Sequence, residues 1–501
     1  MSYKPSKKSL NTHRVPSWFE DAKLGVFIHW GLYSVPGWAP PEKNLDGIPT
    51  NHATSPYAEW YENTMKIEGS PTRDFHNSTY GPNFSYADFR KEFLAQSARA
   101  DMDAWAQFIQ DIGGKYAIFT TKHHDGYNLW PTRNPNPRRG EWNTERDFVG
   151  ELTKALRKRG LRSGAYYSAI WDWSFQEEPI QDEYTMLING DGSHRYARYA
   201  HNQFRELIDR YAPDILYNDI GYPVRGRLEE LLAHYYNTVP EGVANNRWIR
   251  WRIPDNRLIR SIVRGILKLK DSFMKVDWGG TDMKIGFGDY ATPEFQTVSE
   301  VIPQKWECIR GLGSSFGFNK LEDDDPSLML SGDELIRLFV DIVSKNGNLA
   351  INIGPRPDGS IPQSQRAPLE ALGAWMKVNG DHIYGTRPWK CAEACVGGGE
   401  GVSGGASGSG GADGGSVRFA KKDHNLIIYL SHPGTGRDSF GPGEVFIQGL
   451  ALPSDSQPSL NGVPVSWEKR PGGTLLHLPA DANPAVPVIS IPRAASRASI
   501  S

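Results

Sequence analysis

The hydrophobic pattern of the first two-thirds of the chain consists of short apolar runs that end in polar residues. These runs cover residues 24–31, 115–126, 162–168, 211–223 and 349–355. Short, continuous apolar runs are typical of parallel strands that are covered on both faces. The segments between the runs show helical periodicity, and one of them begins with the capping-box spacing of Ser331 and Glu334. The alternation predicts parallel βα units that form a (β/α)8-like barrel.

The pattern of hydrophobic and polar residues changes at about Trp389. Helical periodicity disappears, and short β-type runs follow one another with turn signals between them. We therefore expect a barrel over residues 1–388 and a small antiparallel β-sandwich over residues 389–501. Residues 397–415 are mostly glycine and have almost nothing to bury, which predicts a mobile loop within the sandwich. A chain of 501 residues is long enough for two such domains.

Charge and segment composition exclude several classes of partner. A net charge of −2 and a pI near 6.7 give no electrostatic basis for binding nucleic acid. The N-terminus has no apolar signal region, and no later run has the length of a membrane span. Three cysteines without a paired motif fit a reducing compartment. We expect a cytoplasmic protein with no nucleic-acid and no membrane partner.

The aromatic content favours a sugar ligand. The chain contains 16 Trp, 21 Tyr and 20 Phe. Flat side chains with a polar group suit sugars, which have apolar C–H faces and hydroxyls that need hydrogen bonds. Trp30, Trp38, Trp60 and Trp130 lie close to the polar ends of the predicted strands. For each of them, sugar binding and ordinary core packing both stay open.

Two carboxylates are the candidates for catalysis. Asp219 ends an apolar run and precedes a Gly-Tyr-Pro turn, and barrel chemistry occurs where the strands end. The alternative for Asp219 is a helix cap or a turn. A retaining glycosidase needs a second carboxyl group about 5 to 5.5 Å away. Glu307 lies between Trp306 and Cys308, an apolar setting that would raise its pKa, and Glu294 is its competitor.

Several long motifs resemble the α-L-fucosidases of glycoside hydrolase family 29. They cover residues 18–38, 55–65, 120–130, 166–168, 213–223, 305–319 and 347–362. The resemblance implies an exo-acting, retaining α-L-fucosidase that needs no cofactor and no metal. It places the family's nucleophile on Asp219 and its acid/base residue on Glu307. It also implies a sugar-binding arginine, which we leave unassigned within residues 247–306.

The resemblance also implies a set of fucose contacts. L-Fucose carries three free hydroxyls and a methyl group on C5. The histidines and the glutamate of the set would hold the hydroxyls, while Trp60 or Phe316 would cover the methyl group. Tyr217 stands where many members of the family have Trp. The full set is His29, Glu59, Trp60, His123, His124, Tyr166, Tyr217 and Phe316.

Four alternatives stay open at this stage. His29, His123 and His124 with Glu59 would also suit a metal site or a structural role. Adjacent histidines on one strand normally point to opposite faces unless the strand end is distorted. The chain as a whole would also fit a catalytically silent, lectin-like fucose-binding relative, or a hydrolase of another α-linked sugar.

Residues 257–270 form an amphipathic segment with an unusual basic face. Six apolar residues fall on one side of the predicted helix, and arginines and lysines fall on the other. The ordinary interpretation is a helix that covers the barrel. We predict instead a homo-oligomer contact near the catalytic end of the barrel.

Overall fold

The computed structural model describes most of the chain. The described residues are 2–42, 51–176, 178–251, 258–259, 261–263, 265, 286–397, 415–432, 443–479 and 486–500. Most of the glycine-rich segment 397–415 lies outside the described residues, and so does most of the amphipathic segment 257–270. The predictions for these two segments therefore stay predictions.

Seven parallel strands form the central sheet, in the order β5-β4-β3-β2-β1-β7-β6. The strands are β1 (Leu24–Ile28), β2 (Tyr116–Lys122), β3 (Arg162–Ser168), β4 (Ile215–Asp219), β5 (Val243–Ala244), β6 (Trp306–Arg310) and β7 (Gly347–Ile353). Nearly every strand residue is buried, as the continuous apolar runs predict. β1 lies inside the sheet, paired with β2 on one side and with β7 on the other.

An irregular segment closes the curled sheet between its two edge strands, β5 and β6. The N–H of Asp289 donates to the carbonyl of Ala244 at the end of β5 (2.7 Å). On the other side, the N–H of Ile309 in β6 donates to the carbonyl of Pro293 (3.0 Å), and Glu294 forms a parallel bridge with Ile309. Proline has no N–H to donate, which explains why this eighth position is not a regular strand. The predicted (β/α)8-like barrel is confirmed.

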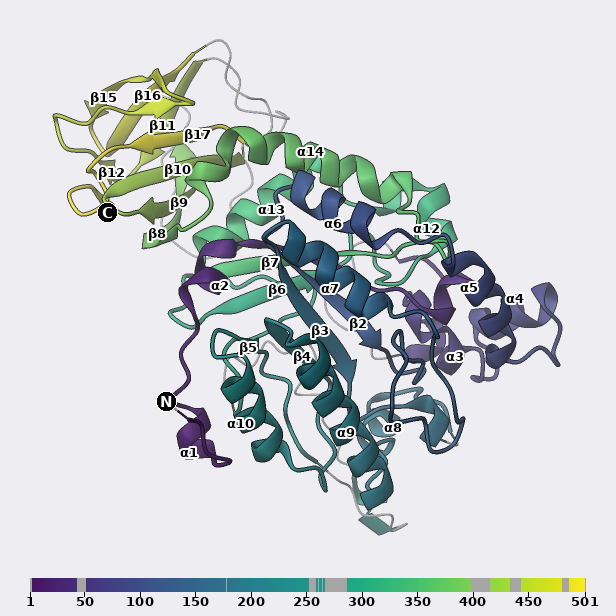
Figure 1. Ribbon diagram of the computed structural model, residues 1–501. Helices are drawn as coiled ribbons and strands as arrows, with labels where there is room; N and C mark the ends of the chain where they lie inside the picture. The colour runs from purple at the N-terminus through teal and green to yellow at the C-terminus, as the bar shows by residue number, and fades with distance from the viewer. Residues whose placement is uncertain are drawn as a thin grey trace.

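Helices surround the sheet (Figure 1). They are α1 (Lys7–Leu10), α2 (Ser17–Ala22), α3 (Tyr61–Thr64), α4 (Pro71–Thr79), α5 (Phe89–Ser97), α6 (Met102–Asp111), α7 (Phe148–Lys158), α8 (Glu183–Ile188), α9 (His194–Tyr211), α10 (Leu228–Thr238), α12 (Lys320–Asp324), α13 (Gly332–Ser344) and α14 (Gln363–Asn379). The predicted capping box of Ser331 and Glu334 starts α13. In the described part of the chain, no helix is long and apolar enough to cross a membrane.

The C-terminal part of the chain is antiparallel, as predicted. Within its described residues, nine strands form one sheet in the order β14-β13-β17-β10-β9-β8-β11-β16-β15, and β12 and β18 pair with each other separately. They are β8 (Arg387–Gly397), β9 (Ser416–Lys422), β10 (Asn425–His432), β11 (Gly443–Gln448), β12 (Leu450–Ala451), β13 (Ser459–Leu460), β14 (Val463–Pro464), β15 (Ser466–Arg470), β16 (Gly473–Leu478), β17 (Val488–Ile491) and β18 (Ser499–Ile500). The long β8 pairs with β9 and with β11, and one hydrophobic core contains residues from both sides of it. The sequence pattern does not predict β8.

Candidate active site

A cavity lies at the carboxyl ends of the parallel strands. Its lining residues are Phe27, His29, Tyr57, Glu59, Trp60, His123, His124, Tyr166, Met186, Tyr217, Asp219, Ile220, Glu294, Ile309 and Phe316. The structure therefore brings together Asp219 and all eight residues that the resemblance implies as fucose contacts. Glu307 is absent from this lining, whereas its competitor Glu294 is present.

Asp219 is the last residue of β4, and donors hold both of its carboxyl oxygens. The Tyr166 hydroxyl donates to Oδ2 (2.7 Å), and Arg247 Nη1 donates to Oδ1 (2.8 Å). Nε2 of His124 lies 3.6 Å from Oδ2. The next residue, Ile220, has φ 60°, an uncommon conformation for a β-branched residue, and its N–H also donates to Oδ1 (2.8 Å). The hydrogen bonds from Tyr166, Arg247 and the N–H of Ile220 fix the carboxylate at the edge of the cavity.

Arg247 brings Glu294 close to Asp219. The same Nη1 atom lies 2.8 Å from Asp219 Oδ1 and 2.5 Å from Glu294 Oε1, so the two oxygens are no farther apart than the sum of these distances. That limit agrees with the roughly 5 to 5.5 Å between the two carboxyl groups of retaining glycosidases. Thr292 fixes the guanidinium, because its hydroxyl and its carbonyl accept from Nε and Nη2 (3.0 and 2.8 Å).

Glu307, the residue predicted to be the acid/base, lies deeper in the barrel and does not line the cavity. It is fully buried in β6, where its Oε1 accepts from the hydroxyl of Tyr116, the first residue of β2 (2.5 Å). Burial raises its pKa to about 8, as its apolar neighbours predict. Side chains on one face of a strand repeat every two residues, and it is Ile309 that lines the cavity. Glu307 therefore belongs to the layer below, nearer the amino ends of the strands.

The histidines of the cavity are neutral. Burial lowers the pKa of His29 to about 4. It also lowers the pKa values of His123 and His124 well below the usual value, and the ammonium of Lys122 adds to the effect on His124. Both adjacent histidines line the cavity, which fits the shift of register between β2 and β3 at Thr120 and Lys122. Neutral imidazoles suit an uncharged, hydroxylated ligand.

Hydrogen bonds behind the cavity select one tautomer for two of these rings. Ser168 donates its only proton to the carbonyl of Trp171 (2.9 Å), so its oxygen accepts from Nδ1–H of His124 (2.6 Å). The amide nitrogen of Asn352 donates to another backbone carbonyl (2.6 Å), so its oxygen accepts from Nδ1–H of His29 (2.6 Å). In both rings Nε2 is therefore unprotonated and can accept a hydrogen bond from a hydroxyl.

Glu59 adds a donor, and aromatic rings add apolar walls. Burial raises the pKa of Glu59 to about 8, so that this carboxyl group is protonated at neutral pH. Its Oε2 accepts from the N–H of Gly317 (2.7 Å). Trp60 stacks on His52 with ring centroids 4.5 Å apart, and the Phe316 ring also lines the cavity.

Of the four tryptophans proposed as sugar platforms, only Trp60 lines the cavity. Trp30 and Trp130 are buried in the core, and Trp38 stacks on Phe75 with ring centroids 4.6 Å apart. The cavity also uses residues that the sequence analysis does not name, namely Phe27, Tyr57, Met186, Ile220 and Ile309.

Arg247 falls in the interval left open for an arginine. A signal for it exists in the sequence, since Asn-Asn-Arg-Trp directly follows the short strand β5.

Among the described residues, no group of three or more His, Cys, Asp or Glu side chains is placed to hold a metal ion.

Comparison with known proteins agrees with this geometry. A family model described as alpha-L-fucosidase matches residues 1–381. Tissue alpha-L-fucosidase of Mus musculus is 30% identical over 397 residues, which cover 77% of this chain and 75% of that protein. The Homo sapiens tissue enzyme is 31% identical over 395 residues, with 77% and 73% covered.

Solved structures show the same likeness over nearly the whole chain. An alpha-fucosidase of Thermotoga maritima in complex with a mechanism-based inhibitor is 36% identical, with a TM-score of 0.79, and 98% of this chain and 99% of that chain are covered. The same source gives a complex with fucose at 35% identity and a TM-score of 0.78, covering 98% and 100%.

Proposed function

The chain belongs to the alpha-L-fucosidase family, whose members are glycoside hydrolases, and we propose that it releases terminal α-L-fucose from fucosylated glycans or glycosides as an exo-acting, retaining enzyme. The observation that carries this proposal is the pair of carboxylates at one cavity. Asp219 and Glu294 come from different barrel positions and contact the same nitrogen of Arg247.

The proposed reaction has two displacements. Asp219 attacks the anomeric carbon and forms a covalent fucosyl-enzyme, while Glu294 gives a proton to the leaving glycosidic oxygen as its bond to that carbon breaks. A water molecule then gives its proton to Glu294 and attacks the same carbon, which frees Asp219. The positive charge of Arg247 between the two groups reduces their mutual repulsion.

The hydrogen-bonding groups of the cavity support fucose as the sugar. Nε2 of His29 and of His124 would accept from sugar hydroxyls, and the protonated Glu59 would donate to one. Trp60 and Phe316 would cover the C5 methyl group. L-Galactose carries a hydroxymethyl group in that place, and a buried hydroxyl without a partner costs about 1 to 3 kcal/mol.

One assay tests the proposal against its rivals. We expect release of the aryl alcohol from an aryl α-L-fucoside, much slower release from the aryl α-L-galactoside, and α-L-fucose as the first anomer seen by ¹H NMR. The Asp219→Asn variant measures the background. β-L-Fucose appearing first would reject the double displacement, and comparable rates on both glycosides would reject fucose specificity. Fucose binding without hydrolysis would identify a lectin-like relative.

The proposal also includes the cellular location and the oligomeric state of the protein. A cytoplasmic enzyme is expected from the sequence, and a homo-oligomer is expected from the segment 257–270. Within the described residues of that segment, the apolar side chains of Leu258 and Ile262 are 69% and 52% exposed. Light scattering of the wild type and of Leu258→Asp/Ile262→Asp tests the assembly, and a wild type that is monomeric would reject it.

A further inference from the structure

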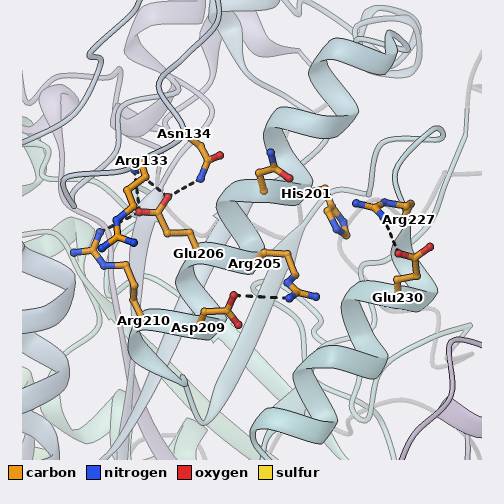
Figure 2. A pocket seen from close by; sticks show the side chains of 10 residues that line it. Arg133, Asn134, His201, Arg205, Glu206, Asp209, Arg210, Arg227 and Glu230 are labelled. Atoms are coloured by element: carbon orange, nitrogen blue, oxygen red, sulfur yellow. Dashed lines mark hydrogen bonds and ion pairs between the residues drawn. The ribbon is translucent and has the colours of Figure 1, made fainter.

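A second cavity, of about 340 Å³, lies between the first turns of α9 and the loop before α10. Three arginines and two histidines line it, and the other two lining residues are alanine and glycine. The five polar residues are Arg198, Arg225, Arg227, His194 and His201. None of the described residues that line this cavity is acidic. It adjoins a larger groove of about 500 Å³ that shares His201 and Arg227 with it (Figure 2).

The carboxylates of the adjoining groove already have partners. The pairs are Glu206 with Arg210 (3.0 Å), Asp209 with His234 (2.5 Å) and Glu230 with Arg227 (3.0 Å). Arg198, in contrast, forms no ion pair with a carboxylate among the described residues. Arg225 donates to Nε2 of His194 (2.5 Å), which makes that imidazole an acceptor and leaves the charge of the guanidinium uncompensated. Arg198 and Arg225 therefore bring positive charge to the cavity without a carboxylate partner among the described residues, whereas Arg227 is paired with Glu230.

Two further features favour an anion in this position. His201 is only 5% exposed, and burial together with nearby arginines lowers its pKa to about 4, so that it contributes hydrogen bonding and no added charge. Its Nδ1 atom contacts the hydroxyl of Tyr222 (3.1 Å), which fixes the ring. Two of the lining residues, His194 and Ala197, lie in the first turn of α9, where the helix dipole is positive.

We propose that this cavity binds a tetrahedral oxyanion, sulfate or phosphate, either as the free ion or as an ester on the substrate. Guanidinium groups match such oxyanions because their donors form parallel pairs of hydrogen bonds. The loop of residues 220–227 runs from Asp219 to Arg225 and Arg227, so the cavity lies at the same end of the barrel as the active site. An acidic ester on the sugar beyond fucose would be recognised there, and this second source rests on the proposed function.

Titration calorimetry with sodium sulfate and sodium phosphate tests the site directly, with sodium chloride keeping the ionic strength constant. We expect saturable binding of one anion per chain, and about tenfold or greater weakening in Arg198→Ser/Arg225→Ser. The control Arg14→Ser/Arg99→Ser makes the same change of charge at exposed arginines elsewhere, and should bind like the wild type. Absence of saturable binding by the wild type, or equal weakening in the control, would overturn the proposal.

A second arm distinguishes the two sources of the anion. Hydrolysis is compared between a neutral fucosyl disaccharide and the same disaccharide with a sulfate ester on the second sugar. A preference for the sulfated substrate that disappears in Arg198→Ser/Arg225→Ser identifies a substrate site, whereas equal rates identify a site for the free ion. If no fucoside is hydrolysed at all, the proposed function fails, and the calorimetry still decides the anion site.

Discussion

Two glutamates at different depths of the barrel, the partly buried Glu294 and the fully buried Glu307, differ in what they can do. Glu294 lies by the carboxyl ends of the strands, lines the cavity and contacts Arg247 (2.5 Å). Glu307 lies in the layer below and is bonded to the Tyr116 hydroxyl. Burial gives Glu307 the raised pKa of a general acid, about 8, yet it does not line the cavity. A suitable pKa identifies a catalytic acid only when the group can also reach the substrate.

Removing Asp219, the proposed nucleophile, should have the largest effect. Asp219→Gly should lower kcat by about 10⁴-fold or more while the protein stays folded. Azide should restore part of the turnover by entering the vacated space, and the product should be β-fucosyl azide because one direct displacement inverts the anomeric centre. The control is Asp214→Asn, just before β4, where the carboxylate pairs with Arg162 (2.8 Å). That variant should lose stability and keep its kcat, and an Asp219→Gly variant with normal turnover would contradict the assignment.

Substitutions of Glu294 and of Glu307 should differ in how their effect on kcat/KM depends on the leaving group of the substrate. Glu294→Ala should lower kcat/KM for natural glycosides by about 10² to 10⁴-fold, and far less for activated aryl fucosides, which leave without a proton. Glu307→Gln should change the melting temperature and leave kcat/KM nearly unchanged on both substrates. The comparison breaks down if the dependence on the leaving group appears in Glu307→Gln and not in Glu294→Ala.

The tautomer of His124 should have a smaller effect. Ser168→Ala removes the acceptor of Nδ1–H and frees the ring to present a protonated Nε2, which should cost about 1 to 3 kcal/mol of substrate binding. We expect a raised KM, together with a changed ¹⁵N chemical shift for Nε2. The matched control is Ser163→Ala at the amino end of the same strand, where the hydroxyl lies 3.4 Å from Asp214. Equal kinetic effects in both variants would indicate a purely structural role for Ser168.

The smallest effect concerns the acid stability of the cavity wall. Burial lowers the pKa of His52 from 6.5 to about 4. Its contribution to the free energy of unfolding is therefore complete above pH 6.5 and is lost as the pH falls toward 4. The Tm difference between the wild type and His52→Gln should be largest at pH 7 and should shrink by a few degrees at pH 5. A difference that stays constant with pH would show that His52 does not resist protonation.

Much of the fold is readable from the sequence because most barrel strands are uninterrupted apolar runs. The segment that closes the barrel is not, since it contains Pro293 and pairs with β5, a strand of only two residues. The order of the strands in the sheet and their pairing are set by tertiary contacts, so the apolar runs alone do not predict them.

The candidate site, too, is predicted from the sequence only in part. Residues that come directly after predicted strands, such as His29 and Asp219, are found at the cavity as expected. The sequence places Glu307 on a strand, but it does not say which layer of the barrel the side chain occupies. Glu294 and Arg247 meet only through the tertiary structure, because they lie 47 positions apart in the chain and no local pattern links them.

The anomeric configuration of the azide product made by Glu294→Ala tests the central claim most directly. If Glu294 is the acid/base residue, this variant still forms the fucosyl-enzyme from an activated aryl fucoside, and azide then attacks from the side that the aryl group has left. The account predicts α-fucosyl azide from Glu294→Ala and ordinary hydrolysis, without azide product, from Glu307→Ala. α-Fucosyl azide from Glu307→Ala, with none from Glu294→Ala, would contradict it.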